Sequence, residues 1–279
     1  MDRDQLNRLT RRDILAAGLA TASAMAFGSS SRALGAVEPY GPFKMGIQSY
    51  SLRHFKLDDA LAKTKELGLH YWESFSAHIP VVNEPAKAEG YKRQAADSGV
   101  QVIGYGVSHF TKNIEENRKL FEFAQTMGLA YLSADPDPDS FDSLDQLVEQ
   151  YGVAVGIHNH GPGHRYEKID TIAKAIKDHH EKIGCCIDTG HFLRSKEDPV
   201  RAVEVFGKRI YGVHLKDVRN ATEFTILGKG DLKTAELLKG LAKLKHNYCL
   251  ALEYEENESA PMDDLRACLT ETKRVVAML

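Results

Sequence analysis

Residues that could bind a metal ion or move a proton follow several short apolar runs of this 279-residue chain. The clearest run is 153–157, which is rich in β-branched residues and reads as a strand buried on both faces, and His-Asn-His-Gly follows it at 158–161. Comparable residues after other runs are Gln48, Glu73, Asp188, His191, His214, Lys216, Glu253 and Glu255. Because parallel strands present their carboxyl ends at one edge, we expect these side chains to converge on one site.

Four of these side chains predict one divalent metal ion. A carboxylate or imidazole buried at a strand end costs several kcal/mol unless it is paired or bound to a cation. The predicted ligands are His158, Asp188, His214 and Glu253. Two imidazoles and two carboxylates suit Mn²⁺, Co²⁺, Fe²⁺ or Zn²⁺ better than they suit Ca²⁺ or a metal that prefers thiolates. Mg²⁺ is a further candidate. A single strand-end histidine is more often structural, so the prediction rests on the number of ligands, and His160 or His191 could replace one of them.

The apolar runs belong to a repeated unit in which an amphipathic helix ends at a glycine and a strand follows. Such joints carry Gly68, Gly99, Gly128 and Gly152. Strands are predicted at 43–49, 69–72, 100–103, 129–132, 153–157, 185–188, 210–214 and 248–253. Asp198 before Pro199, and Asp231, are predicted to open helices. Repeated βα units without a glycine-rich phosphate turn after the first strand predict an α/β fold, a single (β/α)8 TIM barrel over residues 37–279.

The N-terminal segment differs from the barrel in composition. Two arginines, Arg11 and Arg12, precede an alanine-rich apolar stretch over 16–27, and small residues follow as far as Ala36. This order is that of a twin-arginine export signal. We therefore expect residues 1–36 to be removed and the protein to be periplasmic or extracellular, with no membrane attachment after cleavage. The alternative is an N-terminal arm outside the fold.

Composition and charge narrow the class of partner. The net charge is -3, with acids and bases interleaved and no basic stripe, which argues against nucleic acid. A hydrophobic content of 43% is enough for a full-sized core. The 4 cysteines include an adjacent pair and make a poor disulfide framework, so we expect buried thiols. The expected partner is a small molecule, and the sequence leaves self-association into a homo-oligomer open.

Five short motifs carry a resemblance to a known superfamily. They lie at 157–161, 187–191, 213–217, 227–231 and 252–253. Together they resemble the xylose-isomerase-like sugar phosphate isomerase/epimerase superfamily of TIM barrels, over residues 43–278. The metal ligands implied by this resemblance are Asp188, His214 and Glu253. It also implies that His191 contacts substrate and that the loop at 228–230 closes over it. Epimerases of the superfamily usually carry a glutamate on strand five, where this chain has His158, so one of the two carboxylates used in two-base epimerisation is missing.

These features predict a metal-dependent enzyme that removes a proton next to a carbonyl of a sugar or cyclitol. Glu253 is the predicted base, and His160 or His191 is predicted to handle the second proton. Lys216 is predicted either to polarise a carbonyl or hold a phosphate, or to neutralise Asp217. The predicted substrate contacts are Gln48, Glu73, Asn159, Gly228 and Lys229. Return of the proton defines an isomerase or epimerase, and loss of a β-hydroxyl or glycosidic oxygen defines a dehydratase or lyase.

Two other classes remain open from the sequence. A non-catalytic sugar-binding barrel would keep the polar strand ends but would not exchange an α-proton of its ligand. A metal-dependent phosphodiesterase or abasic-site nuclease would need more His and Glu ligands and a basic groove, and the charge of -3 argues against it. The predicted export makes a free sugar or glycoside a more natural substrate than a phosphorylated metabolite.

Overall fold

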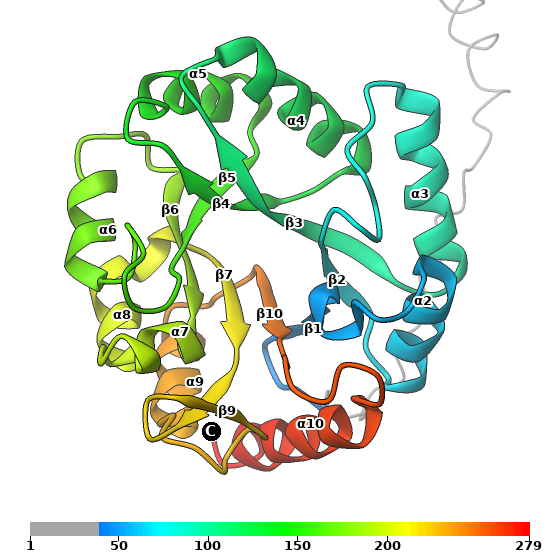
Figure 1. The fold of residues 1–279 in the computed structure, drawn as a ribbon, viewed down its shortest axis with the longest axis vertical. Helices are drawn as coiled ribbons and strands as arrows, with labels where there is room; N and C mark the ends of the chain where they lie inside the picture. Colours follow the sequence, from blue (N-terminus) through cyan, green and yellow to red (C-terminus); the bar gives the residue numbers. More distant parts are fainter. Residues whose placement is uncertain (1–38) are drawn as a thin grey trace, which may run out of the picture. The chain divides into compact units, whose positions relative to one another are not determined.

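The computed structural model describes residues 39–279. Parallel strands close into a barrel, and helices surround it (Figure 1). In the order of their pairing the strands are β1 (Lys44–Gln48), β10 (Cys249–Leu252), β7 (Ile210–Leu215), β6 (Ile183–Asp188), β5 (Ala154–His158), β4 (Tyr131–Pro136), β3 (Gln101–Phe110) and β2 (Tyr71–Ser74). β2 pairs with β1 and completes the ring. The predicted TIM barrel is confirmed, whereas the export signal predicted at 1–36 lies outside the described residues and stays a prediction.

The helices lie between successive strands and cover the outside of the barrel (Figure 1). They are α2 (Leu57–Glu66), α3 (Pro85–Asp97), α4 (Ile114–Met127), α5 (Phe141–Tyr151), α6 (Ile169–Ile176), α7 (Thr189–Arg194), α8 (Pro199–Phe206), α9 (Thr234–Lys243) and α10 (Met262–Val276). Two short 3-10 turns are η1 (Ser49–Leu52) and η2 (Gly207–Arg209). Between residues 39 and 279, no helix combines the length and the apolar character that crossing a membrane requires.

Local sequence signals set most of the helix ends. Gly128 ends α4 with a φ of 74°, a left-handed conformation that glycine adopts without strain. Asp198 caps α8 with its side chain, as predicted. The prediction for Asp231 is wrong, because α9 begins at Thr234. The backbone N–H of Asp231 is bonded instead to the carbonyl of Val218 in the segment after β7.

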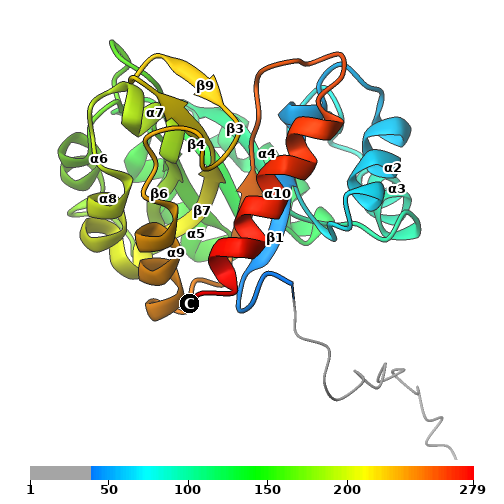
Figure 2. The ribbon, with the colours of Figure 1, turned by 90° about the horizontal axis from the view of Figure 1, so that it is seen from below.

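A small antiparallel hairpin after β7 was not predicted. It consists of β8 (Asp217–Arg219) and β9 (Glu223–Thr225), with Val218 paired to Phe224. Figure 2 shows the hairpin at the same end of the barrel as the loop that follows β10, opposite the C-terminus. Its strands have three residues each, which is too short to give a period-two pattern in the sequence. The hairpin adds a flap at the end of the barrel where the candidate residues lie.

The barrel interior is filled at the amino ends of the strands. Tyr131 is fully buried there, in a small cluster with Ile103, Ala154, Tyr211, Cys249 and Ala251. Its ring leaves no room at Gly104, where an added Cβ would stand 2.3 Å from the ring. All four cysteines are buried and free, which confirms the prediction of buried thiols. This packed floor closes the barrel beneath the candidate ligands, so the site can open only at the carboxyl ends of the strands.

Candidate active site

The four predicted metal ligands meet at the carboxyl ends of the barrel strands. His158 ends β5, Asp188 ends β6, His214 lies on β7 and Glu253 follows β10. One ligand atom of each residue lies within 4.8 Å of those of the others, and all four residues are buried. We call these four residues the ligand cluster. Barrel closure is what brings them together, since they are spread over 96 positions of the chain, from 158 to 253.

The ligand atoms of the cluster face one another. Nδ1 of His214 lies 2.9 Å from Nε2 of His158 and 3.2 Å from Oε2 of Glu253. Oδ2 of Asp188 lies 3.9 Å from the same nitrogen and 3.5 Å from Nε2 of His158. Both of these carboxylate oxygens are buried, and Nζ of Lys216 lies 2.9 and 2.8 Å from them. Two buried carboxylate oxygens and two ring nitrogens that face one another fit a divalent metal ion bound by nitrogen and oxygen.

Asp188 is positioned by hydrogen bonds that leave one oxygen for the cluster. Its Oδ1 accepts a 2.7 Å bond from the backbone N–H of His191 and so caps α7. The side chain of Asn159 donates to the backbone carbonyl of Asp188 and accepts from its N–H, both at 2.8 Å. Asn159 is fully buried by these bonds. Its side chain supports Asp188 in this structure, and its contact with substrate stays a prediction.

Glu73 lies in the barrel interior, beside His214. Its side chain is fully buried, with Oε1 2.9 Å from Nε2 of His214 and 2.9 Å from the donor nitrogen of Gln48. The hydroxyls of Tyr131 and Ser133 donate to the same carboxylate. Burial opposes its charge, yet His214 and the two hydroxyls hold the pKa of Glu73 below its usual value. In this structure the Glu73 carboxylate has four partners and no exposed surface, and its contact with substrate stays a prediction.

Lys216 lies among three carboxylates. Its Nζ is 2.9 Å from Oδ2 of Asp188 and 2.8 Å from Oε2 of Glu253, and it also pairs with Glu255. Burial alone would raise the pKa of Glu253, but Lys216 and His214 lower it to about 2. Glu253 is therefore ionised at neutral pH. Lys216 does not neutralise Asp217, the second role considered for it, because its charge is taken up by these other carboxylates.

A hollow of about 330 Å³ opens above the ligand cluster, and we call it the site hollow. The residues expected at the site that line it are Gln48, His158, His160, His191, Lys216, Glu253 and Glu255. An apolar wall of Tyr50, Phe75 and Val107 was missed by the sequence analysis. Tyr50 and Val107 remain 38% and 43% exposed. In the sequence, Tyr50 and Phe75 could have been found only from their position, because they come within two residues of the ends of β1 and β2.

The two histidines outside the cluster are neutral at pH 7. Burial and the neighbouring imidazole of His158 lower the pKa of His160 to about 3. Burial likewise lowers the pKa of His191 to about 4, although Asp188 opposes the shift. Each ring can donate one N–H hydrogen bond and accept another, but neither holds an extra proton in the metal-free protein. Their role in handling the second proton stays a prediction.

The glycine-rich loop at 228–230 does not reach the site hollow. The Asp217 carboxylate accepts backbone N–H bonds from Gly228 and Gly230, at 2.9 and 3.0 Å, and pins the loop to the hairpin. Both glycines line a separate hollow beside α9 and α10, and Lys229 is exposed. This structure does not bring Gly228 and Lys229 to the site hollow, and their contacts with substrate stay predictions. Phe224 of the hairpin lies near the site instead, with its ring centroid 5.2 Å from Nζ of Lys216.

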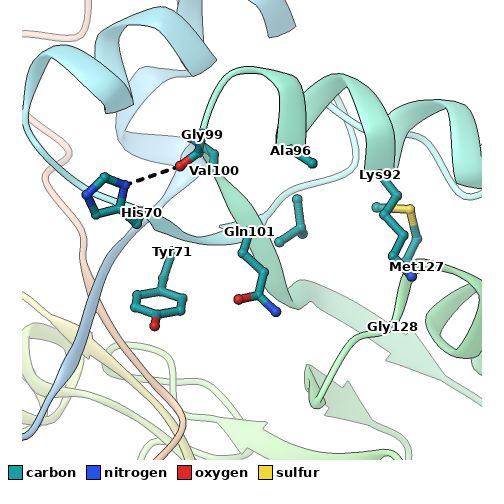
Figure 3. Close-up of a pocket in the computed structure, with 10 residues that line it drawn as sticks. His70, Tyr71, Lys92, Ala96, Gly99, Val100, Gln101, Met127 and Gly128 are labelled. Atoms are coloured by element: carbon teal, nitrogen blue, oxygen red, sulfur yellow. Dashed lines mark hydrogen bonds between the residues drawn. The ribbon is translucent and has the colours of Figure 1, made fainter. Parts of the chain in front are cut away.

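Another hollow, of about 430 Å³, lies at the opposite ends of β2 and β3 (Figure 3). Its polar lining comes from His70, Tyr71, Lys92 and Gln101. The ring of His70 is engaged with the backbone carbonyl of Gly99, 3.2 Å away. None of the predicted site residues lines this hollow. Chemistry in a TIM barrel belongs to the carboxyl ends of the strands, so we place the function at the site hollow.

A family comparison agrees with this geometry. Residues 61–272 match the family model described as xylose isomerase-like TIM barrel. The chain belongs to this family. The matched range includes all four residues of the ligand cluster. This membership confirms the resemblance to xylose-isomerase-like TIM barrels that the five sequence motifs indicated.

Individual relatives match over shorter stretches. The rhizopine catabolism protein MocC of Rhizobium meliloti is 29% identical over 139 residues, which are 43% of this chain and 42% of that protein. An inosose dehydratase of Clostridium botulinum is 28% identical over 141 residues, 43% of this chain and 47% of that enzyme. These matches thus span less than half of either relative. A crystal structure of D-psicose 3-epimerase from Clostridium cellulolyticum superposes with a TM-score of 0.67 over 84% of this chain and 99% of that one; its 16% identity supports the shared fold alone.

Proposed function

We propose that this protein is a metal-dependent enzyme that removes a proton next to a carbonyl group of a sugar or cyclitol. The observation that carries the proposal is the buried ligand cluster, which opens onto a hollow of small-molecule size. Similarity to a protein named inosose dehydratase supports a sugar-like substrate. Family membership supports the same class of chemistry without fixing the reaction.

Glu253 is the proposed base. Its carboxylate lines the site hollow and is ionised at neutral pH, so it can accept a proton from a carbon placed above it. A divalent ion held by the ligand cluster would supply Lewis-acid polarisation of the substrate carbonyl. Lys216 and Gln48 line the same hollow and can donate hydrogen bonds to sugar oxygens. These donors would orient the substrate so that the acidic C–H faces Glu253.

Elimination is the second candidate reaction, and the residue at the end of β5 favours it. Two-base epimerisation needs a base on each side of the reacting carbon. His158 stands where epimerases of the superfamily carry a glutamate, and Glu73 is too deeply buried to replace that carboxylate. Loss of a β-hydroxyl or glycosidic oxygen needs a single base. Glu253 would take the α-proton, the C–O bond would break as the C=C bond forms, and the proton would pass from Glu253 to the departing oxygen, which leaves as water or an alcohol. The neutral rings of His160 and His191 can donate hydrogen bonds to that oxygen as it leaves.

We further propose that the substrate is an unphosphorylated sugar, cyclitol or glycoside. Among the described residues that line the site hollow, the one lysine or arginine is Lys216, and its positive charge is already paired with three carboxylates. A phosphate adds nearly two negative charges and would find no free partner there. The twin-arginine signal predicted at 1–36 would place the enzyme outside the cytoplasm, where free sugars and glycosides are available.

Deuterium uptake tests the proposed chemistry. The protein is loaded with Mn²⁺, Co²⁺, Fe²⁺, Zn²⁺ or Mg²⁺ and incubated in D₂O with a panel of keto sugars, keto-glycosides and inososes, and NMR follows the α-proton and any product. We expect exchange or turnover, about one metal ion per chain, and a loss of at least ~100-fold in Glu253→Gln. Glu256→Gln, which alters a neighbouring exposed carboxylate, is the matched control.

Three outcomes separate the alternatives. Undiminished turnover in Glu253→Gln with its metal content intact rules out Glu253 as the base. Exchange with return of the proton identifies an isomerase or epimerase, and a product with a new double bond identifies a dehydratase or lyase. Saturable sugar binding without exchange by any metal-loaded form would make the protein a sugar-binding barrel.

A further inference from the structure

We propose that Glu73 is a positioning residue that fixes the imidazole of His214 for metal binding. This inference rests on the metal site of the proposed function. Oε1 of Glu73 lies 2.9 Å from Nε2 of His214, while Nδ1 of the same ring faces His158 and Glu253. A neutral imidazole has one N–H and one lone pair. A carboxylate beside Nε2 favours the N–H on that nitrogen and leaves the lone pair of Nδ1 for a metal ion.

The contact between Glu73 and His214 crosses the barrel interior. The two residues lie on β2 and β7, which are not neighbours in the sheet, and both are fully buried. Water cannot take the place of either partner there. An imidazole that loses its carboxylate would therefore be free to rotate or to change tautomer inside the cavity, and either change moves the lone pair away from the cluster.

Glu73 is itself held rigidly from two other strands. Gln48 on β1 donates to Oε1 at 2.9 Å, and Ser133 and Tyr131 on β4 donate their hydroxyls. Gln48 stands level with Glu73 in the register of β1 with β2. Its side-chain oxygen accepts the backbone N–H of Tyr50 at 3.2 Å, so both ends of the amide are oriented. These bonds fix the Glu73 carboxylate at one position, which is what orienting a metal ligand requires.

Gln48 also connects Glu73 to the site hollow. Its side chain lines the hollow, while its amide nitrogen donates to Glu73. A sugar oxygen bound at Gln48 and a metal ion bound at His214 would thus depend on the same carboxylate. Loss of that carboxylate should weaken metal binding directly, through His214, and disturb substrate binding only through Gln48.

The size-matched variant Glu73→Gln tests the proposal. It keeps the shape of the side chain but removes the charge and places an amide where one of the oxygens was. We expect its affinity for Co²⁺ and Zn²⁺, measured by competition with a chelator, to fall by ~10- to 100-fold. We also expect a changed visible spectrum of bound Co²⁺. Circular dichroism and thermal unfolding of the metal-free protein check that the variant is folded.

Tyr105→Phe is the matched control. It removes a buried hydroxyl on β3 that donates at 3.0 Å to the backbone carbonyl of Ile79, and it leaves the partners of Glu73 and of the ligand cluster unchanged. We expect its metal affinity to stay within ~3-fold of that of the unmodified protein, because it alters the protein interior without touching the metal site. In a His214→Ala background, Glu73→Gln should cause no further loss of affinity, since Glu73 acts through that ring.

Several results would overturn the proposal. One is a folded Glu73→Gln protein that binds Co²⁺ within ~2-fold of the unmodified protein and with the same spectrum. Equal losses of metal affinity in Glu73→Gln and Tyr105→Phe would mean that the loss comes from general packing of the protein interior. If Glu73→Gln does not fold, Glu73→Asp withdraws the carboxylate by one methylene while keeping its charge, and undiminished affinity there refutes the proposal as well. An unmodified protein that binds none of these ions refutes the proposed function, and this inference with it.

Discussion

Replacement of Lys216 by methionine should tighten metal binding while it destabilises the metal-free protein. The Lys216 ammonium lies 2.8 and 2.9 Å from Oε2 of Glu253 and Oδ2 of Asp188, the oxygens available to a metal ion. A metal ion at the ligand cluster would therefore share these oxygens with a positive charge already present. Methionine has a similar length and no charge, so the variant removes the competing cation with little change in packing.

The expected magnitude follows from the burial of the group. Lys216 is 3% exposed, and Asp188 is fully buried. Removal of one partner from a buried ion pair typically costs ~3–5 kcal/mol, because the remaining charge is left without compensation. At the lower figure the melting temperature of the metal-free protein should fall by ~6–12 °C. A bound divalent ion would replace the ammonium as the positive partner of these carboxylates. The variant therefore regains the same ~3 kcal/mol when the metal binds, which corresponds to up to ~100-fold higher metal affinity.

Two measurements check this prediction. Isothermal titration with Mn²⁺ or Co²⁺ gives the affinity, and thermal unfolding with and without metal gives the stabilisation. Lys239→Met, which removes an exposed lysine on α9, controls for the change in net charge. Equal metal affinity and equal melting temperatures in Lys216→Met and the unmodified protein would refute the reasoning. Weaker metal binding in Lys216→Met would mean that the ammonium supports the metal site rather than competing with it.

Three further predictions concern the support of the barrel and the site. Burial lowers the pKa of His246 to about 4, so the folded state keeps it neutral while the unfolded chain takes up a proton below its ordinary value near 6.5. This stabilisation is present above pH 6.5 and is lost as the pH falls towards 4. Between pH 7 and pH 5 the unfolding free energy, measured with urea, should therefore fall by ~2 kcal/mol less in His246→Gln than in the unmodified protein. Asn159→Ala leaves two buried backbone groups of Asp188 unpaired and should lower the unfolding free energy by ~2–5 kcal/mol, whereas a loss below ~1 kcal/mol would contradict the bonding described. Gly104→Ala places a Cβ 2.3 Å from the ring of Tyr131 and should lower the melting temperature by more than ~5 °C, with unchanged unfolding as the contrary result.

The sequence was sufficient for the barrel and for the ligand cluster. Alternating helices and apolar strands have strong local periods, and strand ends in a parallel barrel meet at one edge by geometry. His158, Asp188 and His214 could be assigned to that edge because each stands in or directly after an apolar run. The hairpin of β8 and β9 could not be assigned in this way, because three-residue strands have no measurable period.

The sequence alone determined which metal-ligand side chains end the strands at the carboxyl edge of the barrel, and the tertiary structure decided which polar side chains line the site hollow. Glu73, Asn159 and Gly228 have the residue types and positions of substrate contacts, yet all three are taken up by internal hydrogen bonds or ion pairs. Their partners are His214, Asp188 and Asp217, between 11 and 141 positions away in the chain. Burial and pairing at such separations depend on barrel closure and on the depth of each side chain within it. A linear pattern of residue types contains neither quantity, and both are needed to separate a ligand, its support and a substrate contact.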